Sequence, residues 1–239
     1  METKIRRILE FTKGPADWQA FLSDPTKHWV RGYSARTLAH SWEAANGFPP
    51  EVAATLGASL EPLMKDLSPV LAVPEFKVPL PGGDRASQND IFVLATSSAG
   101  PVAIMVEGKV NESFGPTLGD WRAQDSPGKK TRLKFLCRTI GLKDAPDENI
   151  RYQLLHRSAS AIIEGERFHA VAAVMLVHSF SERRTGLQDY KAFLRLYGVA
   201  AEVGQLQMVT DRTAIPLFAA WVPGDLEYLK ARSRHRRTY

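Results

Sequence analysis

The sequence predicts a mixed α/β fold in which a central sheet is covered by helices on both faces. With 239 residues, the chain is long enough for one large domain with a substantial core. Strand-sized apolar runs, such as Ile91–Ala95 and Ala170–Val177, alternate with segments of helical periodicity. Because these runs are apolar at almost every position, both faces of their strands should be buried.

The amino-acid composition indicates what kind of protein this is and where in the cell it would lie. Hydrophobic residues make up 44% of the chain and charged residues 24%, as in ordinary globular proteins. The single cysteine, Cys137, cannot form an intrachain disulfide, which favours a reducing compartment. No apolar run is long enough for a signal peptide or a membrane span. We therefore expect a cytoplasmic protein with no membrane partner.

The N-terminal part of the chain should be helical. Residues 15–25 predict a short helix that begins near a proline and ends at Asp24-Pro25. The next helix should run from an N-cap at Ser34 to just before Gly47. A third should run from Pro50 to about Leu67.

The remaining elements alternate. A strand is predicted near Phe76–Leu80, followed by a Pro-Gly-Gly turn and the two apolar runs from Ser87 to Val110. Helices are predicted at 128–142, 148–168 and 186–198, with strands at 169–180 and 215–224. We divide the chain into an N-terminal helical extension (1–33), the main α/β domain (34–225) and a basic C-terminal tail (226–239).

The candidate site lies in the two apolar runs. They are separated by a short break, Ser97–Gly100, of a length typical of hairpin loops. If Thr96 pairs with Pro101, the same register places Asp90 directly opposite Glu107, with Cβ atoms about 5 Å apart. Lys109 lies two residues beyond Glu107 and so projects from the same face of the strand.

Residue chemistry indicates a metal site. Two carboxylates facing each other at the edge of a buried hairpin destabilise it unless a positive charge compensates them. Mg²⁺ prefers carboxylate oxygens and would supply that charge. The Lys109 ammonium would orient a water or stabilise charge that builds on a phosphate. This set of residues suits phosphodiester cleavage.

The segment "ND…VEGK" resembles the signature of the PD-(D/E)xK nuclease superfamily, with Asp90 as its first acid and Glu107-Gly108-Lys109 as its second half. Asn89 replaces the usual proline. The resemblance covers roughly residues 34–180. It implies a restriction endonuclease-like core of helix, three antiparallel strands, helix and strand, preceded by the helical extension. The chain is also similar to an uncharacterised bacterial family within that superfamily.

The resemblance implies further roles. Glu43, on the first core helix, would be an additional metal ligand. Gln153 and Arg157 resemble the Gln-x-x-x-basic pattern on the helix after the motif; Gln153 would steady the attacking water and Arg157 would bind phosphate. The implied protein is a nuclease that requires Mg²⁺ (or Mn²⁺), acts most naturally on DNA and belongs to a group often found as homodimers.

Other interpretations remain open at this level. Asp84 in the Gly-Gly-Asp turn is an alternative to Asp90, and the acids and Lys109 could be ordinary strand-end residues. A non-catalytic binding module on the same fold is the main alternative function, and an enzyme acting on another phosphate ester is a third. His178 and Cys137 are expected to be structural. The arginine-rich tail is consistent with phosphate contacts.

Overall fold

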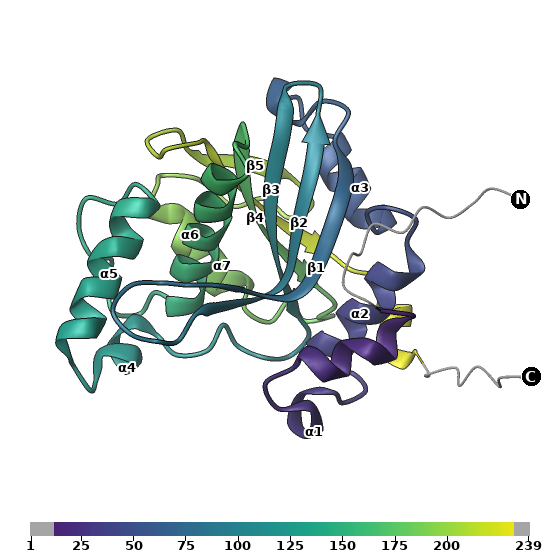
Figure 1. The fold of residues 1–239 in the computed structure, drawn as a ribbon, viewed down its shortest axis with the longest axis horizontal. Helices are drawn as coiled ribbons and strands as arrows, with labels where there is room; N and C mark the ends of the chain where they lie inside the picture. The colour runs from purple at the N-terminus through teal and green to yellow at the C-terminus, as the bar shows by residue number, and fades with distance from the viewer. Residues whose placement is uncertain (1–11, 232–239) are drawn as a thin grey trace, which may run out of the picture.

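The computed structural model describes residues 12–231, which form a mixed α/β fold around an open six-stranded sheet (Figure 1). The strand order is β1-β2-β3-β4-β6-β5. The neighbours β1/β2, β2/β3 and β5/β6 are antiparallel, whereas β3/β4 and β4/β6 are parallel. The strands are β1 (Ser68–Val78), β2 (Ser87–Ser97), β3 (Gly100–Lys109), β4 (Ala172–Ser179), β5 (Leu206–Thr210) and β6 (Leu217–Pro223).

Helices cover both faces of this sheet. On one side lie α5, α6 and α7, and on the other α2 and α3 (Figure 1). The α-helices are α1 (Pro25–His28), α2 (Ser34–Ala44), α3 (Pro50–Gly57), α4 (Leu118–Arg122), α5 (Pro127–Thr139), α6 (Tyr152–Arg167) and α7 (Leu187–Arg195). The short 3-10 helices are η1 (Pro15–Phe21), η2 (Pro62–Met64) and η3 (Leu226–Lys230).

The predicted double-sided burial is confirmed. Every residue of β4 is buried. Successive side chains of β3 enter different cores: Met105 packs in the core beneath α5, α6 and α7, whereas Ile104 and Val106 pack in the core beneath α2 and α3. A strand that serves two cores must be apolar at consecutive positions, which explains the continuous apolar runs.

The predicted hairpin register is also confirmed. Thr96 pairs with Pro101, and the ladder continues to the pair Ile91 and Val106. Along the chain, α2, β1, β2, β3, α6 and β4 follow one another as helix, three strands, helix and strand. The helices α4 and α5 are inserted between β3 and α6.

Several predicted boundaries were wrong. The helix expected from Pro50 to Leu67 ends at Gly57, and only the turn η2 follows it. The first strand begins at Ser68, eight residues before the predicted Phe76, because its prolines and charged residues masked its extended character. The short elements α4 and β5 were not predicted. Within residues 12–231, no helix combines the length and apolar character needed to cross a membrane.

Candidate active site

The carboxylate pair lies on the face of the sheet that α6 covers. Asp90 is near the start of β2, and Glu107 and Lys109 are at the end of β3. The last paired residues of this hairpin are Ile91 and Val106, so Asp90 and Glu107 are the next positions in register. Asp90 Oδ2 accepts a hydrogen bond from the Gly108 backbone N–H at 2.8 Å, which ties the start of β2 to the end of β3.

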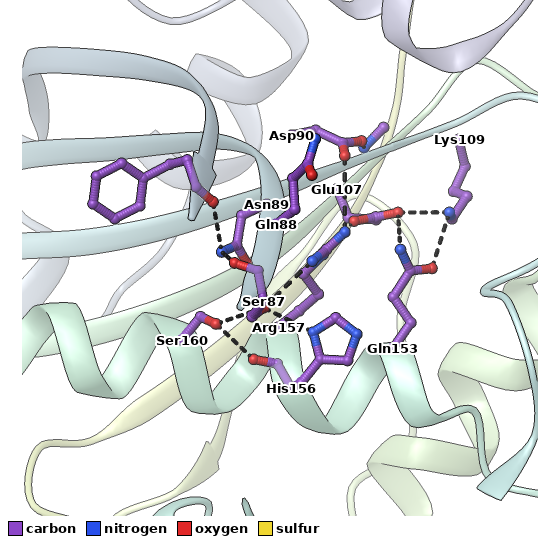
Figure 2. Close-up of polar contacts among 12 residues, drawn as sticks. Ser87, Gln88, Asn89, Asp90, Glu107, Lys109, Gln153, His156, Arg157 and Ser160 are labelled. Atoms are coloured by element: carbon purple, nitrogen blue, oxygen red, sulfur yellow. Dashed lines mark hydrogen bonds and ion pairs between the residues drawn. The ribbon is translucent and has the colours of Figure 1, made fainter. Parts of the chain in front are cut away.

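Lys109 and Gln153 meet at one oxygen of Glu107. Lys109 Nζ lies 2.6 Å from Glu107 Oε1 and donates to Gln153 Oε1 at 3.2 Å. Gln153 Nε2 donates to the same Glu107 oxygen at 2.7 Å. The Lys109 ammonium also lies 4.8 Å from the centre of the Phe114 ring. Residues from β3 and α6 thus form a closed hydrogen-bonded triangle (Figure 2).

Arg157 contacts both acids. Its Nε donates to Glu107 Oε2 at 2.5 Å, and one terminal nitrogen lies 3.9 Å from Asp90 Oδ1. In Figure 2 its side chain rises from α6 toward both acids, and a dashed line joins its head group to Asp90. From the sequence, a divalent cation is expected to compensate the charges of the two acids. In this structure two side chains, Arg157 and Lys109, provide that compensation.

The environment pushes the pKa values of the two acids in opposite directions. Burial raises the pKa of Asp90 well above its usual value, and the neighbouring Glu107 and Glu75 carboxylates raise it further. Burial also tends to raise the pKa of Glu107. The positive charges of Arg157 and Lys109 have a larger effect, so the pKa of Glu107 is lowered overall. Glu107 is therefore the ionised member of the pair, and Asp90 the one that more readily holds a proton.

Glu75 is a third acid near this site, and no pattern in the sequence singled it out. The pairs Pro74 with Ile91 and Phe76 with Asn89 flank it, so the register places Glu75 opposite Asp90. Its φ of 51° is left-handed, which is unusual inside a strand. Its Oε2 accepts a hydrogen bond of 2.6 Å from Gln88 Nε2. Burial, with the nearby Glu107 charge, raises its pKa to about 7.

A second polar cluster supports Arg157 from the side of α6. Ser87 Oγ lies 2.8 Å from His156 Nδ1 and accepts a 2.8 Å hydrogen bond from Ser160 Oγ. One Arg157 terminal nitrogen donates to the same serine oxygen at 3.4 Å. Gln153, Arg157 and Ser160 recur at spacings of four and three residues and form one polar stripe on α6. In the sequence, the four-residue spacing singled out Gln153 and Arg157 but not Ser160, Ser87 or His156.

Other candidate residues lie elsewhere. Glu43 Oε1 accepts hydrogen bonds from Thr12 Oγ1 at 2.8 Å and Trp18 Nε1 at 3.0 Å, which directs this carboxylate to the N-terminal segment. Asp84 is exposed in the connection between β1 and β2. His178 is fully buried and bonds Trp42 and Glu51, and Cys137 is buried on α5. The structure thus unites Asp90, Glu107, Lys109, Gln153 and Arg157, but not Glu43.

The chemistry of the donors fits one hard cation. Asp90 and Glu107 offer carboxylate oxygens, and Mg²⁺ commonly uses one or two protein carboxylates together with water and substrate phosphate. Within the described chain, no group of three histidine, cysteine or acidic side chains is placed to hold a metal ion. Any ion would compete with Arg157 and Lys109 for the oxygens of Glu107.

Fold and site together define a class: an open mixed α/β sheet with a buried carboxylate, lysine and arginine cluster at the end of its central strands. The chain belongs to the DUF6946 family, described as a domain of unknown function, whose model matches residues 11–226. No curated protein and no solved structure matches the chain.

Proposed function

We propose that this protein is a metal-dependent phosphodiester hydrolase, with DNA as its substrate. The observation that carries the proposal is the convergence of Asp90, Glu107 and Lys109 with Gln153 at one end of the sheet. An acid pair can hold a hard cation, and an ammonium on the same strand face can stabilise charge on a phosphate. Together these groups can cleave a phosphodiester.

The order of elements supports the same proposal. The succession of α2, β1, β2, β3, α6 and β4 agrees with the core that the PD-(D/E)xK resemblance implies. The parallel pairing of β3 with β4, connected through α6, brings Gln153 beneath the end of β3. A cytoplasmic location remains part of the proposal on the single cysteine, and a homodimer remains part of it by analogy with the resembled superfamily.

Each side chain has a role that its contacts support. Asp90 and Glu107 would hold one Mg²⁺ or Mn²⁺, which when bound supplies Lewis acidity and an activated water. Lys109 and Gln153 would orient the attacking water, because each already places a donor near Glu107 Oε1. Arg157 would pair with the substrate phosphate, since a guanidinium binds carboxylate and phosphate with the same fork of donors.

The burial of Glu107 and Lys109 favours a second candidate function, that of a non-catalytic binding module. Glu107 and Lys109 are only 3% and 4% exposed, and both oxygens of Glu107 already accept hydrogen bonds. Asp90 is the more open acid, with 20% of its side chain exposed. A cluster satisfied in this way stabilises the fold without any ion or substrate.

Cleavage and metal binding measured together separate these functions. Lys109→Ala should lower the rate of plasmid or oligonucleotide cleavage with Mg²⁺ or Mn²⁺ by about 10²–10³-fold, as for loss of one electrostatic stabiliser. Calorimetric metal titration should show binding that is retained or tighter in Lys109→Ala, because a competitor for Glu107 Oε1 is removed, and binding that is lost in Asp90→Ala. Glu166→Gln, an exposed acid on α6, is the matched control.

Two results would contradict the proposal. If the wild type cuts neither DNA nor RNA and binds no divalent ion, the binding module becomes the better account. If the wild type cuts and Lys109→Ala cuts equally well, the role assigned to Lys109 is wrong.

A further inference from the structure

A separate pocket lies along α5. Its volume is about 900 Å³, and it is bordered by α5, the end of α4 and the segment 141–145 that follows α5. None of the candidate site residues lines it. Pockets of this size commonly bind small molecules or short segments of a polymer.

The rim of this α5 pocket is strongly basic. Lys130, Lys134 and Arg138 recur at intervals of four residues, so they form an exposed row on one face of α5. Like charges at this spacing repel and weaken a helix unless an anion compensates them. Asp125 pairs with Lys130 at 2.8 Å, whereas no acid within residues 12–231 pairs with Lys134 or Arg138. The full set of charged lining residues is Arg122, Lys129, Lys130, Lys134, Arg138 and Lys143, with the acids Asp125 and Asp144.

The floor of the α5 pocket is apolar and partly aromatic. Leu133, Phe135 and Leu142 line it, and Phe135 is partly exposed. The Arg138 guanidinium lies 5.9 Å from the centre of the Phe135 ring. A flat aromatic ring beside an arginine is a surface on which a nucleic-acid base can stack.

We infer that the α5 pocket binds single-stranded nucleic acid, with phosphates along the Lys130, Lys134 and Arg138 row and an unpaired base on Phe135. A duplex keeps its bases paired and stacked inside, so its bases could not reach this floor. The inference deepens the proposed function, since it names the form of the substrate strand, but binding alone tests it.

The test measures fluorescence anisotropy of labelled single-stranded DNA and RNA on the full chain over a range of salt concentrations. Lys134→Glu/Arg138→Glu should weaken binding at least tenfold at low salt. It should also reduce the slope of log K against log salt by about 1.4, which corresponds to two lost phosphate contacts. Phe135→Leu should weaken binding about tenfold with an unchanged slope, because stacking is not an ionic contact.

The control is Lys65→Glu/Arg195→Glu, which makes the same charge change at two exposed residues outside the pocket. This variant should keep most of the affinity. Circular dichroism and melting curves should show that all variants are folded. Duplex DNA of the same sequence and polyglutamate should compete poorly.

Binding that is indifferent to Lys134→Glu/Arg138→Glu overturns the inference. Equal affinity for the duplex, combined with no effect of Phe135→Leu, also overturns it. Metal titration distinguishes this failure from failure of the proposed function, because the pocket variants should bind Mg²⁺ like the wild type. A protein that binds single strands through this pocket but cleaves nothing would retain the inference and lose the proposed function.

Discussion

The backbone of Glu75 departs from strand geometry at the level of the candidate site. A left-handed conformation costs a non-glycine residue on the order of 1–3 kcal/mol and persists only where the surrounding structure enforces it. Here Val73 and Phe76, three positions apart, pack with the same core, so the normal alternation of the strand is broken between them. The alternation is also broken on β2. Ser87 and Asp90 lie three positions apart, yet the side chains of both contact Arg157.

Glu75→Gln should therefore change how stability depends on pH. The folded-state pKa of about 7 lies above the ordinary value of 4.5, so the folded protein holds this proton more tightly than the unfolded chain. The Glu75 carboxyl therefore contributes to the free energy of unfolding below about pH 4.5. This contribution is lost as the pH rises through 7. At pH 8 the variant should melt several degrees above the wild type, at about 2–4 °C per kcal/mol for a chain of this size.

The difference in melting temperature should shrink at pH 5, where the wild-type carboxyl is mostly protonated in the fold. Glu166→Gln, an exposed acid on α6, should shift little at either pH. An equal difference between wild type and Glu75→Gln at both pH values would show that the Glu75 charge is not the cause.

The connection between β1 and β2 is held against α5 by backbone contacts. Arg132 of α5 donates to the carbonyl oxygens of Leu80, Pro81 and Gly83. Gly82 has a φ of 85°, and a Cβ atom there would lie 2.1 Å from the Gly128 carbonyl oxygen. In Figure 1 this connection extends from the sheet to α5. The contact links the sheet to the helix that carries the basic row.

Gly82→Ala should consequently destabilise the protein. The added methyl group collides with backbone rather than with a flexible side chain, so the connection must move away from α5. We expect a fall in melting temperature of more than about 4 °C, since the backbone strain alone costs on the order of 1–3 kcal/mol.

The control for this change is Gly57→Ala, the same substitution at the end of α3. Apart from its chain neighbours and the backbone of α3 itself, nothing lies within 4 Å of the added Cβ there, and alanine is the better helix former. Its melting temperature should be unchanged or higher. Equal melting temperatures for Gly82→Ala and the wild type would refute the close packing described.

At the scale of the whole molecule, two stretches of the chain are dense in positive charge. The net charge of the chain is +5. One region is the basic row on α5. The other is the predicted C-terminal tail, of which Lys230 lies in η3, whereas Arg232, Arg234, Arg236 and Arg237 lie outside the described residues.

Removal of residues 232–239 deletes four arginines and lowers the net charge from +5 to +1. If the tail contacts phosphates, the truncated protein should bind nucleic acid more weakly and with a flatter dependence on salt. The loss should add to that of Lys134→Glu/Arg138→Glu if the two regions act independently. An unchanged salt slope after truncation would exclude the tail from binding.

Local patterns in the sequence were enough to predict the fold class and the hairpin. Continuous apolar runs indicate strands buried on both faces, and a short loop fixes the register of the residues on either side. From these two rules alone, Asp90 was placed opposite Glu107 and Lys109 on the same face. The spacing of Gln153 and Arg157 placed both on one side of a helix. These relations depend only on residues near one another in the chain.

Contacts between distant segments could be decided only by the tertiary structure. Arg157 neutralises the acid pair because α6 crosses the end of β3, and no local pattern sets that crossing. Glu75 joins the site because the pairing of β1 with β2 sets it opposite Asp90, and its left-handed backbone interrupts the alternation of the strand. Glu43 faces Trp18 rather than the pair because η1 packs beside α2. Charge compensation depends on the distances between charged side chains. The spacing of residues in the sequence determines such distances only when both residues lie in the same helix, strand or hairpin.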